Sequence, residues 1–227
     1  MEDDSTLALA PDLVISSART RTVKKGHAVI EPGSPGDAAY LVVAGKVKVS
    51  QQTGLGPSNV LVLGPGEVFG ELSLFDGDTQ APSAHAVTAV TLRELERDVL
   101  DELLDAHIEV ATWLIRHFAR RLRRTNDATA DLVFSDVAAR LAQVLLDLAE
   151  QFGREDDDAV LVDHGLTQRE LAQIAGTTRE SVNKTLASYA ARGWISVASR
   201  SVRILDLNAL IRRAGRPSRI PGPATRA

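Results

Sequence analysis

Cysteine is absent from this chain of 227 residues. Disulfides, iron–sulfur clusters, thiolate metal sites and cysteine nucleophiles are therefore excluded. No stretch approaches the ~18 consecutive apolar residues that a membrane-spanning helix needs. The segment from Met1 to Leu13 is acidic and has no apolar run, so it does not look like a secretory signal. These absences predict a cytoplasmic protein.

Clustered metal ligands are also lacking. The five histidines are scattered, and no two of them stand one residue apart. A metalloenzyme built on a jelly roll needs clustered ligands of that kind. This alternative is therefore disfavoured, and no catalytic residue and no metal ligand is predicted. His85 is interpreted as a structural histidine whose ring nitrogens are hydrogen-bonded within the β-barrel predicted below.

The formal net charge of −4 conceals a strong asymmetry. From His164 to the end, eleven Lys and Arg residues stand against three acidic residues, a net charge of +8. Residues 1–163 hold the remaining 15 basic and 27 acidic residues, a net charge of −12. A basic C-terminal third on an acidic body is typical of a nucleic-acid-binding domain joined to a domain with another role. Charge alone does not exclude the alternative that the two domains simply have different surface charges and that neither binds nucleic acid.

Between residues 19 and 95, short apolar runs alternate with turns rich in glycine and proline. Glycine supplies positive φ in such turns and proline a fixed φ. Many short strands at this spacing favour a barrel or jelly roll over a parallel sheet. The runs are Ala28–Ile30, Tyr40–Ala44, Val47–Val49, Val60–Leu63, Ala84–Val90 and Thr91–Leu95.

After Glu96 the pattern becomes helical. A short amphipathic helix is predicted over Arg97–Ala106, followed by a long helix with a heptad seam that indicates a homodimer interface. A second stripe, formed by Val110, Trp113 and Leu114, is expected to pack on the helix's own domain. A core helix of a monomer is the alternative. The predicted dimer seam consists of Ile108, Ala111, Ile115, Phe118, Leu122, Thr125, Thr129 and Leu132.

The C-terminal third begins with a further helical pattern over Val137–Phe152. An acidic loop is predicted at Gly153–Asp158 and a short strand at Ala159–Val162. Two more strands, Trp194–Val197 and Val202–Leu205, are predicted to form a wing with Arg200 at its tip.

Between these strands, two capping boxes stand ten residues apart, at Thr167 with Glu170 and at Thr177 with Glu180. In a capping box the two side chains satisfy free amides at a helix start. Gly176 lies between the boxes, where a turn needs a left-handed residue. The pair predicts a helix-turn-helix. Its predicted buried residues are Leu171, Ile174, Ala175, Val182, Leu186 and Tyr189.

The second helix of this motif enters the major groove of DNA with its N-terminal residues. Arg can bond two acceptors of guanine, and Glu can accept from the amino group of cytosine. Hydroxyls at a helix N-terminus suit phosphate oxygens. A winged helix that binds protein is the alternative to DNA binding. The predicted DNA-binding residues are Thr167, Gln168, Thr178, Arg179, Glu180, Ser181, Asn183, Lys184 and Arg200.

The whole order, a barrel, a long seamed helix and a winged helix-turn-helix, resembles the CRP/FNR family of transcription regulators over about residues 19–213. The likeness is close in Gly33–Asp37, Gly45–Lys48, Gly66–Phe75 and Leu166–Leu186, and Arg120–Asn126 and Asp131–Val137 look like actinobacterial members. It implies an α+β protein with an N-terminal jelly roll (a double-stranded β-helix) at 1–106. A dimerisation helix and hinge would follow at 107–136, a winged helix-turn-helix at 137–213 and a disordered tail at 214–227.

The resemblance also implies partners. Members of the family bind palindromic DNA with TGTGA-like half-sites as homodimers and work with RNA polymerase. By position, Arg179, Glu180 and Lys184 would read the half-site. No enzymatic activity is implied.

The family's cyclic-nucleotide cassette corresponds to Gly70, Glu71 and Leu72, with Ser83 further on. Where members that bind cAMP carry Arg followed by Ser or Thr to grip the cyclic phosphate, this chain has Gln80 and Ala81. A lost charge-assisted hydrogen bond, about 1.5–3 kcal/mol, weakens binding roughly tenfold to a hundredfold. On the long helix the pocket would be completed by Arg121, Thr125 and Asn126. Weak cAMP binding, another small effector, and a DNA-competent state without ligand all stay open.

Overall fold

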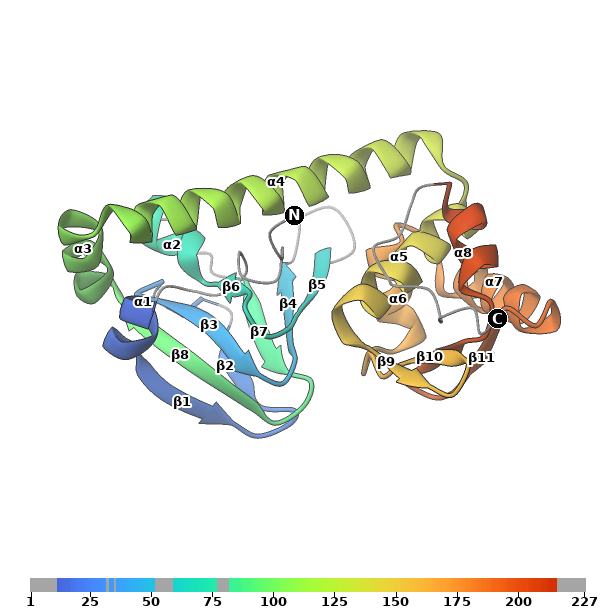
Figure 1. Ribbon diagram of the computed structural model, residues 1–227, viewed down its shortest axis with the longest axis horizontal. Helices are drawn as coiled ribbons and strands as arrows, with labels where there is room; N and C mark the ends of the chain where they lie inside the picture. The colour runs from blue at the N-terminus through green and yellow to red at the C-terminus, as the bar shows by residue number, and fades with distance from the viewer. Residues whose placement is uncertain (1–11, 32, 35, 52–58, 77–81, 216–227) are drawn as a thin grey trace, which may run out of the picture. The chain divides into compact units, whose positions relative to one another are not determined.

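The computed structural model describes residues 12–31, 33–34, 36–51, 59–76 and 82–215, which Figure 1 draws as coloured ribbons. By its internal contacts the chain divides into unit 1, residues 1–126, and unit 2, residues 127–227. The boundary falls within the long helix α4, Ile108–Phe134.

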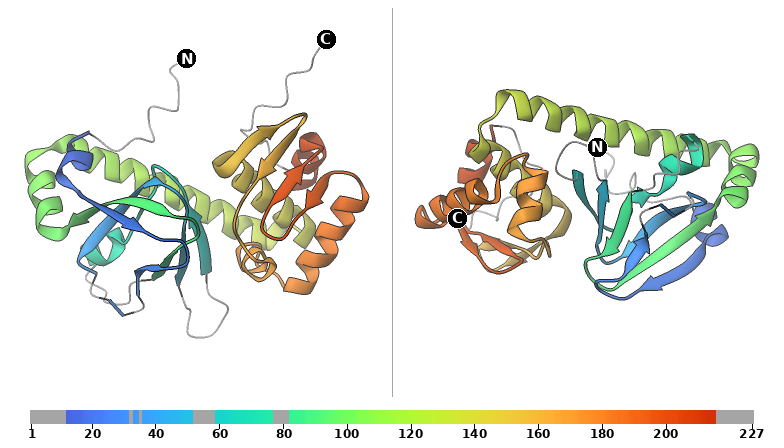
Figure 2. Two further views of the ribbon diagram at one scale, coloured as in Figure 1. Left: turned by 90° about the horizontal axis from the view of Figure 1, so that it is seen from below. Right: turned by 180° about the vertical axis from the view of Figure 1, so that it is seen from behind.

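Unit 1 contains two four-stranded antiparallel sheets that enclose one core (Figures 1 and 2). The strand orders are β1-β8-β3-β6 and β2-β7-β4-β5. This is the predicted jelly roll. Its strands are β1 Arg19–Val23, β2 Ala28–Ile30, β3 Ala38–Ala44, β4 Val47–Gln51, β5 Asn59–Leu63, β6 Val68–Phe69, β7 Ser83–Ala86 and β8 Val90–Glu96.

Strand β3 contributes to two hydrophobic cores because its side chains alternate between the faces of the sheet. Tyr40 and Val42 point into the roll, whereas Leu41 belongs to a second cluster. That cluster includes side chains of α1, Asp12–Ser17, and α3, Arg97–Ala106. The helix predicted over Arg97–Ala106 is thereby confirmed.

Helix α4 is anchored to the roll by one stripe of its surface. Val110, Trp113 and Leu114 are buried in the second cluster, as predicted. A shorter helix, α2, Glu71–Asp76, follows β6 directly. The cassette residue Glu71 is therefore the first residue of a helix.

Besides the end of α4, the described residues of unit 2 form four helices and one four-stranded antiparallel sheet of order β11-β12-β10-β9. Helix α5 contributes more buried residues than any other element of this unit, nine in all. The elements are α5 Val137–Phe152, β9 Gly153–Asp156, β10 Ala159–Val162, α6 Gln168–Ile174, α7 Arg179–Ala191, β11 Ile195–Val197, β12 Val202–Ile204 and α8 Leu207–Ala214.

The prediction of a loop at Gly153–Asp158 is wrong, because the chain forms β9 and turns at Asp157, where φ is +54°. Backbone pairing with β10 holds this strand. The Nε of Arg203 also lies 2.7 Å from Oδ2 of Asp156, which offsets the acidic charge. This arginine is 47 residues away in sequence, so the local pattern did not reveal it.

The predicted strands were incomplete in unit 1. The runs Ala84–Val90 and Thr91–Leu95 correspond to β7 and β8, and the break falls at residues 87–89. Strands β1 and β6 were missed because β1 is mostly polar and β6 has two residues. In unit 2, α8 was not predicted, and it includes Ala214 of the predicted tail. Residues 216–227 of that tail lie outside the described part of the chain.

Candidate functional site

The helix-turn-helix begins with the capping box that was predicted at Thr167. Its Oγ1 accepts a hydrogen bond from the backbone N of Glu170 at 3.2 Å. The carboxylate of Glu170 in turn accepts from the backbone N of Thr167 at 2.7 Å. Both side chains therefore satisfy free amides at the start of α6.

The second predicted box is wrong in its details. Thr178, not Thr177, is the N-cap of α7, and its Oγ1 accepts from the backbone N of Ser181 at 3.2 Å. Glu180 is consequently the second residue of the helix. Hydrogen bonding to its own backbone N–H, and then to the Thr178 side chain, lowers the pKa of its carboxyl. Helix α7 therefore begins one residue later than the predicted box implied.

The turn between the two helices needs Gly176, which has φ +58°. A Cβ on this residue would also lie 2.4 Å from Cδ2 of Leu132. The predicted inner face is confirmed for Leu171 and Ala175 of the first helix, while Ile174 is only half-buried. On α7 the predicted residues Val182, Leu186 and Tyr189 are buried.

The polar side of α7 carries the candidate base-reading residues. Arg179, Glu180 and Lys184 are exposed, as is the N-cap Thr178. Ser181 is half-buried, and its Oγ accepts a hydrogen bond from Thr178 Oγ1 at 3.1 Å. Asn183, which was also predicted to contact DNA, differs from these exposed residues. This side chain is half-buried, with its Oδ1 enclosed and without a hydrogen-bond partner in the described structure.

The remaining candidates for DNA contact lie at the edges of the motif. Thr167 is exposed and Gln168 is half-buried at the start of α6. Arg200 is exposed between β11 and β12, so the predicted wing is present with Arg200 in its connecting loop. The carbonyl of Arg200 accepts a hydrogen bond from the backbone N of Gly165 at 3.0 Å, which ties the loop to the segment before α6.

In unit 1 the structure brings the cassette and α4 together at one ion pair. Nη1 of Arg121 donates to Oε1 of Glu71 at 2.5 Å, and Glu71 is 1% exposed. Burial raises the pKa of the Glu71 carboxyl, and the Arg121 guanidinium counteracts part of that rise. Gly70 immediately before it has φ +82°, and a Cβ there would lie 2.8 Å from the carbonyl oxygen of Ala38.

Other predicted pocket residues have local partners. Ser83 Oγ lies 2.9 Å from Ser50 Oγ. Thr125 Oγ1 donates to the carbonyl of Arg121 at 3.1 Å, and Asn126 is exposed on the same helix. Leu72 points outward and is 48% exposed.

The two positions that matter most for an anionic ligand, Gln80 and Ala81, lie outside the described residues.

Sequence reasoning missed two side chains near this pocket. Nη1 of Arg124 lies 2.7 Å from Oε1 of Glu67, which forms a second ion pair between α4 and the roll. His117 is buried, and its ring contacts those of Trp113 and Phe118. Burial, then the nearby arginines, lowers the pKa of His117 to about 4. The sequence did contain a signal for both residues. His117 and Arg124 lie four and three positions from Arg121, and residues at these spacings are neighbours on one face of a helix.

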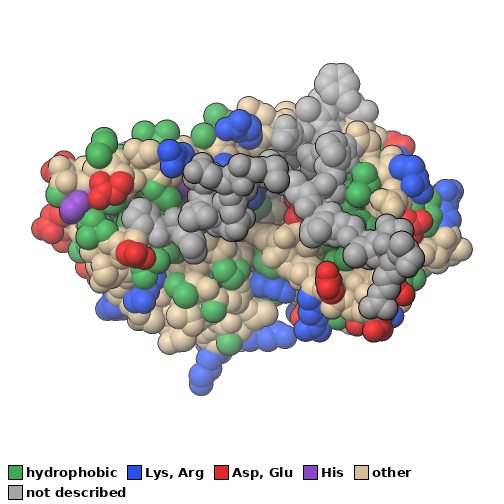
Figure 3. Space-filling model, viewed as in Figure 1, with side chains coloured by type: hydrophobic (Ala, Val, Ile, Leu, Met, Phe, Trp, Pro, Cys, Tyr) green, Lys and Arg blue, Asp and Glu red, His purple; other side chains and the backbone are tan. Residues whose placement is uncertain are grey.

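The predicted dimer seam is largely uncovered within a single chain. Ile108 is 79% exposed, Ile115 66% and Leu122 62%. Hydrophobic side chains are visible along α4 in the space-filling view (Figure 3). Phe118 is half-buried and meets Phe75 of α2 edge-on, with 5.9 Å between ring centroids. The other members are Ala111, half-buried, and Thr125, Thr129 and Leu132, exposed.

The described residues contain no group of three or more His, Asp or Glu that could hold a metal ion. None of the described helices is long and apolar enough to cross a membrane.

Comparison with known proteins matches both units. Residues 20–107 match the cyclic nucleotide-binding domain, and residues 139–213 match the Crp-like helix-turn-helix domain. A CRP-like cAMP-activated global transcriptional regulator from Mycobacterium tuberculosis is 45% identical over 84% of this chain and 85% of its own length. The chain belongs to the CRP/FNR family.

Two proteins from Thermus thermophilus support the same assignment. Its cyclic AMP receptor protein is 34% identical over 87% of this chain and 90% of its own length. The crystal structure of a CRP-family transcriptional regulator from that organism has a TM-score of 0.73 at 29% identity, covering 86% of this chain and 96% of that one. This CRP/FNR member is thus a DNA-binding transcription regulator and not an enzyme.

Proposed function

We propose that the protein is a homodimeric regulator that binds palindromic, TGTGA-like DNA sites. The observation that carries the proposal is the exposed seam of α4. A soluble monomer rarely leaves a long apolar stripe in water, and a heptad seam is satisfied by a second copy of the same helix. In this arrangement residues 107–136 join the partner copies. Each copy then presents one α7.

The proposed partners follow from this arrangement. Two recognition helices would bind half-sites about one helical turn apart, ~34 Å. RNA polymerase is the expected protein partner at promoters, and the cytoplasm the expected location.

The experiment compares two neighbouring substitutions on α4. Leu122→Asn changes the exposed seam, whereas Arg123→Asn changes the next residue, which lies outside it. Sedimentation velocity should give a dimer for the wild type and Arg123→Asn and a monomer for Leu122→Asn. Footprinting should show a palindromic site for the two dimers. A wild type that stays monomeric, or protects no palindrome, contradicts the proposal.

We further propose that this regulator is gated by a small effector and binds cAMP weakly or not at all. Glu71 supplies a carboxylate that fits ribose hydroxyls, and Arg121 is a cation beside it. That cation is already paired with Glu71, so it is a poor replacement for a free phosphate clamp. Gln80 and Ala81 carry no positive charge at the positions where the family grips the phosphate.

Calorimetry with cAMP tests this second proposal. The double variant Gln80→Arg/Ala81→Ser should bind cAMP roughly tenfold to a hundredfold more tightly than the wild type, since it regains a charge-assisted hydrogen bond. Micromolar binding by the wild type itself contradicts the proposal.

The ion pairs of α4 favour a second candidate, a regulator that is DNA-competent without any ligand. Arg121 with Glu71 and Arg124 with Glu67 already hold α4 on the roll. DNA affinity measured with and without cAMP tests whether cAMP gates this protein. A ligand-independent regulator binds its site with the same affinity in both cases.

A further inference from the structure

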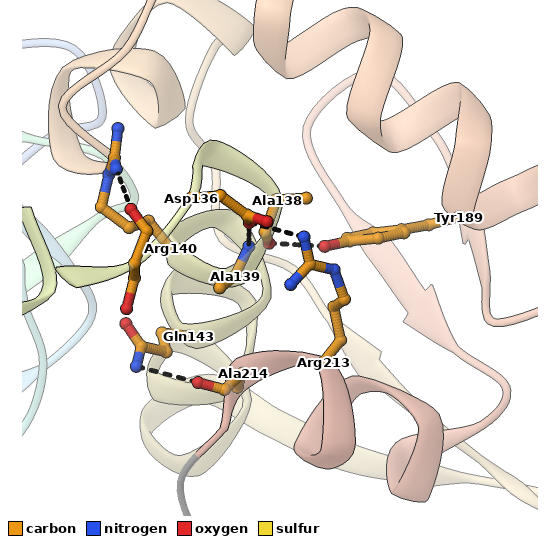
Figure 4. Close-up of polar contacts among 9 residues, drawn as sticks. Asp136, Ala138, Ala139, Arg140, Gln143, Tyr189, Arg213 and Ala214 are labelled. Carbon is orange, nitrogen blue, oxygen red and sulfur yellow. Dashed lines mark hydrogen bonds and ion pairs between the residues drawn. The ribbon is translucent and has the colours of Figure 1, made fainter.

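The start of α5 receives side chains from α7 and α8 (Figure 4). The helix begins immediately after Ser135 and Asp136, at the end of α4. Asp136 caps it by accepting from the backbone N of Ala139 at 2.8 Å. Arg213 of α8 donates to the same Asp136 carboxylate at 2.5 Å. The first turn of α5 is therefore held by contacts that do not involve α7.

Arg140 extends from this turn to the turn of the helix-turn-helix. Its Nε donates to the carbonyl of Ala175 at 2.9 Å, and Nη2 donates to that of Gly176 at 3.2 Å. Its Nη1 donates to the carbonyl of Ser135 at 2.5 Å. One planar guanidinium thus joins the segment between α4 and α5 to the segment between α6 and α7.

The contacts of Arg140 suit the chemistry of the turn. Carbonyls at the end of a helix lack intrahelical partners and carry partial negative charge. A guanidinium offers five N–H donors in a rigid plane, so it can serve several carbonyls at once. A lysine ammonium is a single point charge on a flexible stem and does not reproduce this fork.

The other end of α7 is attached to the same turn of α5. Tyr189 lies near the C-terminal end of α7, and its hydroxyl donates to the carbonyl of Ala138 at 2.5 Å. In Figure 4 the side chains of Tyr189 and Arg213 point toward Ala138 and Asp136. The recognition helix is consequently held on α5 at its start, through the turn, and near its end, through Tyr189.

We propose that the first turn of α5 fixes the orientation of α7 for DNA reading, with Arg140 as the positioning residue for its N-terminal end. Arg140 acts through the carbonyls of Ala175 and Gly176 and not through contact with bases. The inference rests on the proposed recognition of specific sites by α7. Positioning matters for base edges, which must be met in register, and hardly for nonspecific phosphate contact.

The test compares Arg140→Met with Arg154→Met in the full-length protein. Both variants lose one arginine from unit 2, but Arg154 is exposed on β9, at a position paired with Leu161 of β10. Affinity is measured for the footprinted site and for a scrambled duplex of equal length. Arg140→Met should weaken binding to the specific site at least tenfold and change scrambled binding less than twofold. Arg154→Met should leave the specificity ratio unchanged.

Hydrogen exchange supplies a second readout. Amides at residues 175–178 should exchange faster in Arg140→Met, while the amides of α5 keep their protection. Should Arg140→Met fail to fold, Arg140→Lys, which retains the charge, is expected to fold and still lose specificity.

The inference is overturned if a folded Arg140 variant binds the specific site within twofold of wild type. It is equally overturned if specific and scrambled binding fall together. If the wild type itself does not distinguish the two duplexes, the proposed function fails instead.

Discussion

In unit 1 the carboxylate of Glu71 is buried and held by Arg121, fifty residues further along the chain. In unit 2, by contrast, Arg179, Glu180 and Lys184 project from one short helix into solvent. A residue that reads DNA must be exposed and can be found by its position on a helix. A residue that serves a buried pocket depends on a partner from another element.

The charge along the chain changes sign within unit 2, near His164. Residues 1–163 carry a net charge of −12 and the rest of the chain +8. Nucleic acid attracts the basic region without regard to sequence, whereas the ion pair of the buried Glu71 with Arg121 in unit 1 acts over a few ångströms. Substitutions in unit 1 should therefore change stability, and substitutions on α7 should change recognition.

The largest effect is expected from Arg121→Met. This change leaves the buried Glu71 carboxylate without its cation, which typically destabilises a protein by about 3–5 kcal/mol. Urea unfolding monitored by tryptophan fluorescence measures the change in the free energy of unfolding. Arg123→Met, on the exposed side of the same helix, should change the free energy of unfolding by less than about 0.5 kcal/mol. Equal effects of the two substitutions would mean that the ion pair of Arg121 with Glu71 does not contribute to the stability of the protein.

A second unit 1 prediction concerns acid. The pKa of His117 is about 4 in the folded protein, below its ordinary 6.5, because burial and nearby arginines disfavour the charged ring. The unfolded chain therefore binds more protons between these values, and stability falls as pH falls from 6.5 to 4.

Between pH 7.5 and pH 4, the free energy of unfolding of His117→Phe should fall by about 3 kcal/mol less than that of the wild type, since each pKa unit corresponds to about 1.4 kcal/mol. Urea titrations at pH 7.5 and pH 4 would measure the change. His107→Phe, on a partly exposed histidine of the same region, is the control. An unchanged pH dependence in His117→Phe would show that other groups dominate acid unfolding.

On α7, Arg179→Ala should cost about 1–3 kcal/mol of binding at one base-pair position and leave protein stability unchanged. Binding to a panel of single-base variants of the site measures this. An even loss across all duplexes, including scrambled DNA, would assign Arg179 to phosphate contact instead of base reading.

The smallest effect concerns the start of α7. Thr178→Ala removes the N-cap and should destabilise unit 2 by about 1 kcal/mol. Thr177→Ala should change stability by less than about 0.5 kcal/mol, because Thr177 does not cap the helix. Thermal unfolding of the two variants compares them directly. A larger loss of stability in Thr177→Ala than in Thr178→Ala would support the predicted capping box of Thr177 with Glu180.

Elements whose signals are local were predictable from the sequence. Periodicity located the helices at Arg97–Ala106 and Val137–Phe152 within their observed bounds. The capping box at Thr167 and the glycine at 176 located the helix-turn-helix. These signals operate within a few residues, so no knowledge of the rest of the fold was needed.

Resemblance to the family placed Glu71 and Arg121 in one pocket, which the spacing of residues alone does not reveal. The ion pair between Glu67 and Arg124 was missed for the same reason, because these residues are 57 positions apart and come close only when the chain packs. Strand β9 pairs locally with β10, but its acidic residues hid the strand pattern, and Arg203, which pairs with Asp156, is 47 residues away.

By itself, the amino-acid sequence determined that this protein has a roll, a seamed helix and a basic winged helix-turn-helix, because these depend on periodicity, turn residues and charge. Only the tertiary structure decided which polar side chains are buried and what they bind. Asn183 turned inward, Thr178 replaced Thr177 as the cap, and Arg140 bound the carbonyl of Ala175, 35 residues away. Hydrogen bonds are short-ranged and directional, so their partners are selected by folded geometry.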